Sequence, residues 1–123
     1  MNGCFFADTY ALFEIVDGNP EFGKYINDAE IITTSLNLME LYYGLLLKHG
    51  AEKAEAYYSV FQPRAVLFSD ETIKSAMKFR LAQKGKNLSY VDCVGYQVAL
   101  ENNVKFLTGD RGFAGMPNVE YVK

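Results

Sequence analysis

The sequence has a single histidine and only two cysteines, and both scarcities exclude classes of chemistry. A Ser-His-Asp or Cys-His mechanism needs a histidine base. The lone His49 lies near a predicted helix end, where interaction with the helix dipole is the simpler role. Cys4 and Cys93 are far apart in sequence and have apolar neighbours, which favours buried free thiols over a disulfide or a metal pair.

The chain also lacks membrane, secretion and disorder signals. No apolar run approaches the roughly 18 residues of a membrane-spanning helix, and no basic region precedes an apolar segment at the N-terminus. We therefore expect a cytoplasmic location and no membrane partner. Half of the 123 residues are hydrophobic, and the chain has no repeat or linker, which predicts one domain over residues 1–123. The net charge of −3 argues against a protein that coats nucleic acid, but it is compatible with a nuclease that uses acidic metal ligands.

Short apolar segments alternate with helical patterns along the chain, which predicts an α/β fold. Helices are expected over residues 9–16, 20–26, 35–49, 51–61, 70–84 and 89–101. Strands are expected over residues 3–7, 30–34, 65–68, 104–107 and 118–122. This alternation favours a three-layer α/β/α arrangement, in which helices cover both faces of a mainly parallel sheet of about five strands.

The two helices over residues 35–49 and 51–61 form a predicted hairpin. The apolar residues of the first helix recur at three- and four-residue steps, at Leu36, Met39, Tyr43, Leu46 and Leu47. The hairpin carries a further aromatic set, Tyr42, Tyr43, Tyr57, Tyr58 and Phe61. We expect part of this surface to form a protein interface, with simple core packing as the equal alternative.

Two acidic residues follow predicted strands, and parallel strands bring their carboxyl ends to one edge of a sheet. Asp8 ends the first strand, and Asp110 follows the strand over residues 104–107. That edge is where open α/β sheets place their functional groups. Each residue also has a structural alternative, which is helix capping for Asp8 and a simple turn for Asp110.

Two further acidic residues lie in the first turns of predicted helices. Glu40 interrupts an apolar helix face, and an unpaired buried carboxylate is costly enough to need a partner such as a cation. Its alternative is a capping box with Asn37, in a helix that starts later than residue 35. Asp92 completes a capping-box pattern with Ser89, which is compatible with metal binding because a capped turn fixes the direction of the carboxylate.

Four carboxylates at one sheet edge repel one another, and a hard divalent cation relieves this repulsion. Mg²⁺ or Mn²⁺ is expected, since both prefer oxygen ligands and bind substrate phosphates, whereas zinc prefers nitrogen or sulfur. For binding the substrate, Arg111 is the preferred cation. A second candidate for binding the substrate is a basic group near the end of the helix over residues 70–84, made of Lys78, Arg80, Lys84 and Lys86. A solvated helix end is the simpler explanation for this group.

Four segments in register resemble the PIN-domain ribonuclease family, which includes the VapC-type toxins. They are FADTYAL at 6–12, NLMELYYG at 37–44, LSYVDCVGYQVALENN at 88–103 and FLTGDRGF at 106–113. The resemblance covers nearly the whole chain, and it implies that the acidic quartet of the family is Asp8, Glu40, Asp92 and Asp110. Thr108 corresponds to a hydroxyl common near the last acid. Tyr10 stands where the family often has a small polar residue, and it is expected to fill part of the crevice or to stack on a base.

The resemblance implies hydrolysis of RNA with the help of Mg²⁺ or Mn²⁺ bound by Asp8, Asp92 and Asp110. Glu40 would complete the site or orient the attacking water. The resemblance further implies a homodimer and a small antitoxin protein that covers the acidic cleft, as in a type II toxin-antitoxin pair. Two alternatives remain, which are a non-catalytic PIN-like module that binds RNA or protein, and an unrelated α/β phosphotransfer domain with Asp8 as nucleophile.

Overall fold

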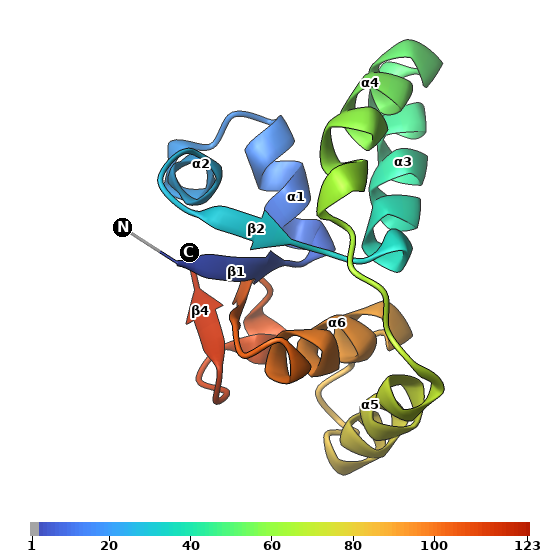
Figure 1. The fold of residues 1–123 in the computed structure, drawn as a ribbon, viewed down its shortest axis with the longest axis vertical. Coiled ribbons are helices and arrows are strands. Elements are labelled where there is room, and N and C mark those ends of the chain that lie inside the picture. The colour runs from blue at the N-terminus through green and yellow to red at the C-terminus, as the bar shows by residue number, and fades with distance from the viewer. Residues whose placement is uncertain (1–2) are drawn as a thin grey trace.

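The protein, described over residues 3–123 by a computed structural model, is built on a parallel four-stranded sheet with helices on both faces (Figure 1). The strands are β1 (Cys4–Ala7), β2 (Glu30–Ile32), β3 (Lys105–Thr108) and β4 (Val119–Tyr121), in the order β2-β1-β3-β4. The helices are α1 (Thr9–Val16), α2 (Pro20–Asn27), α3 (Ser35–His49), α4 (Ala51–Phe61), α5 (Asp70–Ala82) and α6 (Tyr90–Glu101). The predicted α/β class and parallel sheet are confirmed.

The sheet has four strands, and the expected strand over residues 65–68 is wrong. Within the described chain, this segment joins the sheet through one parallel bridge between Ala65 and Thr33. A 3-10 turn precedes the segment and the N-cap of α5 follows it, and beyond Ala65 the chain leaves the edge of the sheet and runs toward α5 (Figure 1). Leu67 is 97% exposed where the chain crosses from the hairpin to α5 (Figure 1).

Alternate residues of β1 and β3 fill two cores on opposite faces of the sheet. Phe6 and Phe106 stack with ring centroids 5.6 Å apart in the core shared with α5 and α6. Ala7 and Leu107 belong to the core formed with α1, α2, α3 and α4. A Cβ on Gly95 would lie 2.9 Å from the Phe6 ring, so the glycine allows α6 to approach the sheet closely. This close approach positions the first turn of α6.

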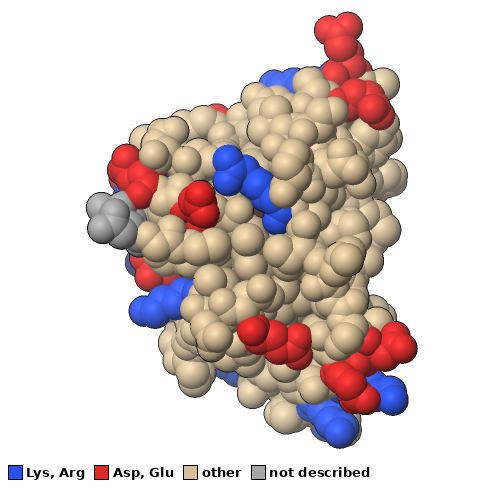
Figure 2. All heavy atoms as spheres, in the orientation of Figure 1, with Lys and Arg blue, Asp and Glu red and all other residues tan. Residues whose placement is uncertain are grey.

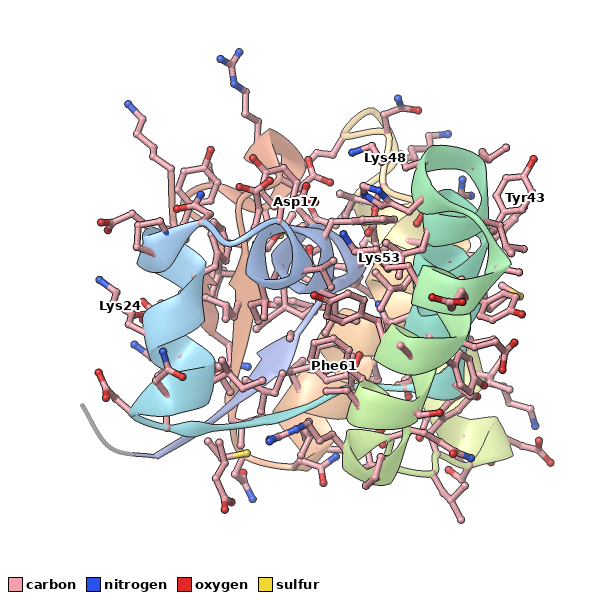
Figure 3. The ribbon with its side chains drawn as sticks, turned by 90° about the horizontal axis from the view of Figure 1, so that it is seen from above. Asp17, Lys24, Tyr43, Lys48, Lys53 and Phe61 are labelled. Carbon is pink, nitrogen blue, oxygen red and sulfur yellow. The ribbon has the colours of Figure 1, made fainter. Side chains whose placement is uncertain are left out.

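The α3–α4 hairpin buries a different stripe from the one that the periodicity predicts. The buried residues of α3 are Asn37, Leu38, Leu41 and Leu45. The predicted stripe faces outwards, with Met39 55%, Tyr43 64% and Leu47 71% exposed. Figure 3 shows Tyr43 pointing away from the body of the protein, whereas Phe61 of α4 points into it and is 1% exposed. Phe61 is therefore a core residue and not part of an exposed aromatic surface.

The helix starts follow the capping signals of the sequence. The Thr34 side chain caps α3, so this helix begins where expected, and the alternative capping box based on Asn37 is wrong. Ser69 and Ser89 form capping boxes at the starts of α5 and α6. In each case the side chain satisfies a backbone N–H group that has no partner within the helix.

The two cysteines are free thiols, as predicted. Cys93 is buried, whereas Cys4 is only half-buried. Across residues 3–123, none of the helices combines the length and the apolar character needed to cross a membrane.

Candidate active site

Asp8 lies at the carboxyl end of β1 and is 2% exposed. Its Oδ1 accepts a hydrogen bond from the backbone N–H of Ala11 over 2.7 Å, which makes Asp8 the N-cap of α1. Its Oδ2 accepts a hydrogen bond from the hydroxyl of Thr108, at the end of the neighbouring strand β3. The capping role expected as an alternative is therefore present, and the same carboxylate is also held at the edge of the sheet.

Asp110 lies just beyond β3 and is joined to Asp8 through Thr108. The Asp110 N–H donates to the Thr108 hydroxyl oxygen over 2.9 Å. The Asp110 Oδ1 accepts from the N–H of Gly112 over 2.9 Å, so the turn expected as an alternative also forms. Thr108 is fully buried, and one hydroxyl thus links the two aspartates that follow adjacent strands.

Asp92 lies in the first turn of α6 and forms the predicted capping box. The Ser89 N–H donates to Asp92 Oδ2 over 2.9 Å, and the Asp92 N–H donates to Ser89 Oγ over 3.0 Å. The second carboxylate oxygen of Asp92 accepts no hydrogen bond from the part of the chain that the structure describes, and the same holds for Asp110. Each residue therefore has one oxygen free for a ligand.

The three aspartates are close enough to act on one another through their charges. Burial raises the pKa of Asp8 from 3.8 to about 7; its two hydrogen bonds oppose this shift, and the charges of Asp92 and Asp110 add to it. Burial also raises the pKa of Asp92, against its capping bonds and with a contribution from the charge of Asp110. Among residues 3–123, no lysine or arginine pairs with any of the three. The cluster therefore has excess negative charge.

Glu40 connects to the site through Thr9. The Thr9 hydroxyl donates to Glu40 Oε1 over 2.6 Å and accepts from Asn37 Nδ2 over 3.1 Å. Glu40 is only half-buried, so the burial expected from its position on an apolar helix face is not complete, and its partner in this structure is the Thr9 hydroxyl. Sequence reasoning missed the roles of Thr9 and Asn37. The available signals were the position of Thr9 directly after Asp8 and a polar residue, Asn37, within the buried stripe of α3.

The predicted substrate-binding residues lie around the aspartates. A Cβ on Gly109 would lie 2.3 Å from the ring of Tyr10, so this ring covers the backbone just before Asp110. Tyr10 also packs against Phe22 with ring centroids 5.9 Å apart, and it remains 43% exposed. Arg111 is exposed at the start of the 3-10 turn that Asp110 caps.

The donor chemistry of the site fits a hard divalent cation. The candidate ligand atoms are all carboxylate oxygens, which hard cations prefer. The charges of Asp92 and Asp110 disfavour the ionised form of the buried Asp8, and a cation would relieve this repulsion. Asp92 and Asp110 each have one oxygen that accepts no hydrogen bond from the described residues. Within residues 3–123, however, no three His, Cys, Asp or Glu side chains already converge as a ligand set. Metal binding therefore requires the carboxylates to move closer together than they are in this structure. His49 is exposed in the last turn of α3, at the opposite end of that helix from Asn37.

Comparison with known proteins gives one family and one fold. A model of the PIN domain matches residues 5–119. The chain is similar to Mycobacterium tuberculosis VapC20, a sarcin-ricin loop cleaving toxin, with a TM-score of 0.81, 17% identity, and 97% of this chain and 99% of that chain covered. It is also similar to a Klebsiella pneumoniae toxin-antitoxin complex, with a TM-score of 0.76, 19% identity, and coverage of 94% and 95%. A third similar structure is VapBC2 from Rickettsia felis bound to a promoter DNA fragment, with a TM-score of 0.73, 20% identity, and coverage of 98% and 99%. No curated protein matches the chain in sequence.

Proposed function

From the premise that the chain belongs to the PIN domain family, we propose that it is a metal-dependent ribonuclease, acting as the toxin of a type II toxin-antitoxin pair. The observation that carries this proposal is the buried carboxyl group of Asp8. Its pKa is raised to about 7 by burial, and the charges of Asp92 and Asp110 contribute. A cluster that stores this much unfavourable charge at the carboxyl edge of a parallel sheet is typical of a functional site.

In the proposed mechanism, Asp8, Asp92 and Asp110 would hold Mg²⁺ or Mn²⁺. When bound, such an ion would lower the pKa of a water and neutralise charge on the phosphoryl and leaving oxygens. Thr108 keeps the Asp8 carboxylate in place through its hydroxyl. Glu40, held at Oε1 by Thr9, would orient the attacking water and accept its proton. As the new bond to phosphorus forms, the bond from phosphorus to the leaving oxygen breaks, and this oxygen takes a proton from solvent.

The RNA substrate is bound by groups at the rim of this cluster. Arg111 is exposed and next to Asp110 in sequence, and its guanidinium group contacts a phosphate of the RNA backbone. Tyr10 has an exposed fraction of 43%, which leaves part of its ring available for a base to stack on. The exposure of both side chains and the proximity of both residues to the Asp110 turn support these assignments.

The direct test compares the wild type with Asp92→Asn on structured and single-stranded RNA. The asparagine side chain keeps an oxygen to accept the Ser89 N–H bond, so the start of α6 should be preserved. We expect cleavage with Mg²⁺ or Mn²⁺, no cleavage with a chelator, and at least about 100-fold slower cleavage by the variant, since even partners of metal ligands contribute 10- to 100-fold. The matched control is Asp28→Asn, at an exposed position before β2. Equal cleavage by wild type and Asp92→Asn, or cleavage that ignores the chelator, would contradict the proposal.

The proposed partners are a second copy of the chain and a small antitoxin. The hairpin exposes apolar side chains of both helices, which are Met39, Tyr43, Leu46 and Leu47 on α3 and Val60 on α4. On the adjoining face shown in Figure 2, much of the hairpin surface is uncharged, with acidic and basic groups near its tip. This surface supports a homodimer through the hairpin. The antitoxin would cover the acidic cleft, and the similar structures include toxin-antitoxin complexes.

The two alternatives give different outcomes. Phosphotransfer through Asp8 would leave a covalent aspartyl-phosphate on the protein, whereas hydrolysis of RNA at a metal site would leave the protein unmodified. A non-catalytic module would bind RNA or a partner protein without cleaving RNA under any metal condition, and the cleavage assay above distinguishes it from the ribonuclease.

A further inference from the structure

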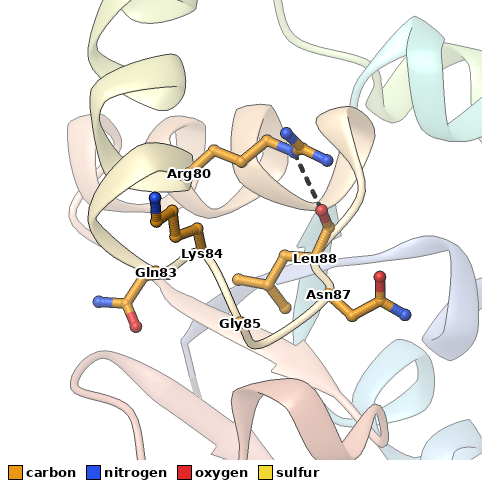
Figure 4. A pocket seen from close by; sticks show the side chains of 6 residues that line it. All are labelled: Arg80, Gln83, Lys84, Gly85, Asn87 and Leu88. Atoms are coloured by element: carbon orange, nitrogen blue, oxygen red, sulfur yellow. Dashed lines mark hydrogen bonds between the residues drawn. The ribbon is translucent and has the colours of Figure 1, made fainter.

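A pocket of about 410 Å³ lies at the carboxyl end of α5 and in the loop that leads to α6. Its lining contains two cations, two amides and no acidic residue, and consists of Arg80, Gln83, Lys84, Gly85, Asn87 and Leu88 (Figure 4). In the described part of the chain, neither Arg80 nor Lys84 forms a salt bridge. The pocket therefore presents uncompensated positive charge together with amide hydrogen-bonding groups.

This pocket borders the acidic cluster. Leu88 forms one of its walls and directly precedes Ser89, the N-cap of α6. On the other side, a Cβ on Gly112 would lie 2.8 Å from Leu88 Cδ2, 3.5 Å from the Lys86 carbonyl oxygen and 3.5 Å from Asp110 Oδ1. The turn that contains Asp110 thus packs directly against the loop that forms the pocket.

An exposed aromatic ring, Tyr90, lies against Arg80, one of the residues that line the pocket. Arg80 Nε donates to the Leu88 carbonyl oxygen over 3.1 Å, which fixes the guanidinium group (Figure 4). The guanidinium carbon lies 4.3 Å from the centroid of the Tyr90 ring. Tyr90 nevertheless remains 64% exposed, although burial of an aromatic ring is favourable. A ring supported by a cation and open to solvent is a suitable surface for stacking a nucleic-acid base.

We propose that this pocket binds the RNA strand next to the cleaved phosphodiester, with Lys84 and Arg80 contacting a backbone phosphate and Tyr90 stacking on the adjoining base. The inference rests on the proposed ribonuclease function and identifies where the substrate strand leaves the acidic cluster. The chain has a net charge of −3, so its overall charge repels RNA and a local cationic pocket has to supply the attraction. Basic groups combined with a stacking aromatic ring are the usual elements of single-strand binding.

The test measures RNA binding separately from cleavage. The probe is a short fluorescein-labelled single-stranded RNA of mixed sequence, and fluorescence anisotropy in EDTA reports its affinity for the full chain. Lys84→Glu should weaken binding and reduce the dependence of log K on log salt by about 0.7 for each phosphate that the protein no longer neutralises. Tyr90→Leu should weaken binding by about 5- to 150-fold, the equivalent of one base that no longer stacks on an aromatic ring. Tyr90→Phe keeps the ring and should bind as the wild type does.

The matched control for charge reversal is Lys105→Glu, at an exposed position at the amino end of β3 and thus at the opposite edge of the sheet. This control should bind RNA with an affinity close to that of the wild type. If Lys84→Glu and Tyr90→Leu bind like this control while the wild type cleaves RNA with metal, the pocket proposal is overturned and the ribonuclease proposal stands. If these two variants lose binding but the wild type cleaves nothing, the pocket is supported and the catalytic proposal fails. Absence of RNA binding by the wild type overturns both.

Discussion

Replacing Asp8 by Asn should stabilise the metal-free protein while it removes RNA cleavage. The pKa of the Asp8 carboxyl group is about 7 in the folded protein, compared with an ordinary value of 3.8. A difference of about 3 pKa units corresponds to about 4 kcal/mol, at about 1.4 kcal/mol per unit. Because Asp8 is 2% exposed, solvent screens little of this cost. Asn keeps an oxygen for the Ala11 N–H, so that hydrogen bond can persist. Its N–H group can donate to the Thr108 oxygen, which reverses the direction of the wild-type hydrogen bond and removes Asp8 as the acceptor of the Thr108 proton.

The direction of the pH dependence follows from the sign of the shift. A carboxyl group with a raised pKa in the folded state binds a proton more tightly when folded than when unfolded. The free energy of unfolding of the wild type therefore falls as pH rises from about 4 to about 7, the interval between the unfolded and folded pKa values. Asp8→Asn lacks this loss. The two proteins should differ little near pH 4, and Asp8→Asn should be more stable by up to about 4 kcal/mol above pH 7.

Urea unfolding in EDTA, followed by circular dichroism at several pH values, measures this difference. The urea m-value should not change, since neither compactness nor the two-state transition is altered. Adding Mg²⁺ or Mn²⁺ should then stabilise the wild type but not Asp8→Asn, because only the wild type retains the buried ligand. The exposed control Asp28→Asn should follow the wild type in both respects. Wild-type and Asp8→Asn stabilities that run parallel from about pH 4 to about pH 8 would refute the reasoning.

Three further perturbations test the scaffold and the proposed interface. Gly95→Ala should lower the free energy of unfolding in urea titrations by about 1–3 kcal/mol, because the added Cβ would lie 2.9 Å from the Phe6 ring. An unchanged midpoint of the urea transition would show that α6 has room to move. Ser89→Ala should lower the free energy of unfolding by about 1 kcal/mol, because the Asp92 N–H group loses its acceptor at the helix cap. The same loss should slow RNA cleavage, since the cap holds the first turn of α6 in place. Unaltered cleavage would show that the site does not depend on the cap. Leu47→Glu should convert a dimer into a monomer in size-exclusion chromatography with an unchanged circular dichroism spectrum, because it places a charge on the apolar hairpin surface. A persistent dimer would place the interface elsewhere.

Features that depend on neighbouring residues could be predicted from the sequence. The helix predicted over residues 51–61 has these bounds in the structure, since a glycine precedes it and a proline-containing turn follows it. The Ser89–Asp92 capping box also formed as expected. The placement of Asp8 and Asp110 beyond parallel strands was also predictable. Local signals indicate where the strands end, and the alternation of strands with helices indicates that the strands are parallel.

Features that depend on distant residues were decided by the tertiary structure. On α3 two apolar stripes compete for burial, and packing against α4 and α1 buries the one with Leu38 and Leu41 rather than the one with Tyr43. Contacts across 31 residues give Glu40 its partner Thr9, and contacts across 100 residues join Asp8 to Thr108. The sequence by itself therefore determined the elements and the acidic residues at their ends, because capping and periodicity act over a few residues. Only the tertiary structure decided which faces are buried and which side chains meet, because those outcomes depend on the packing of whole elements against one another.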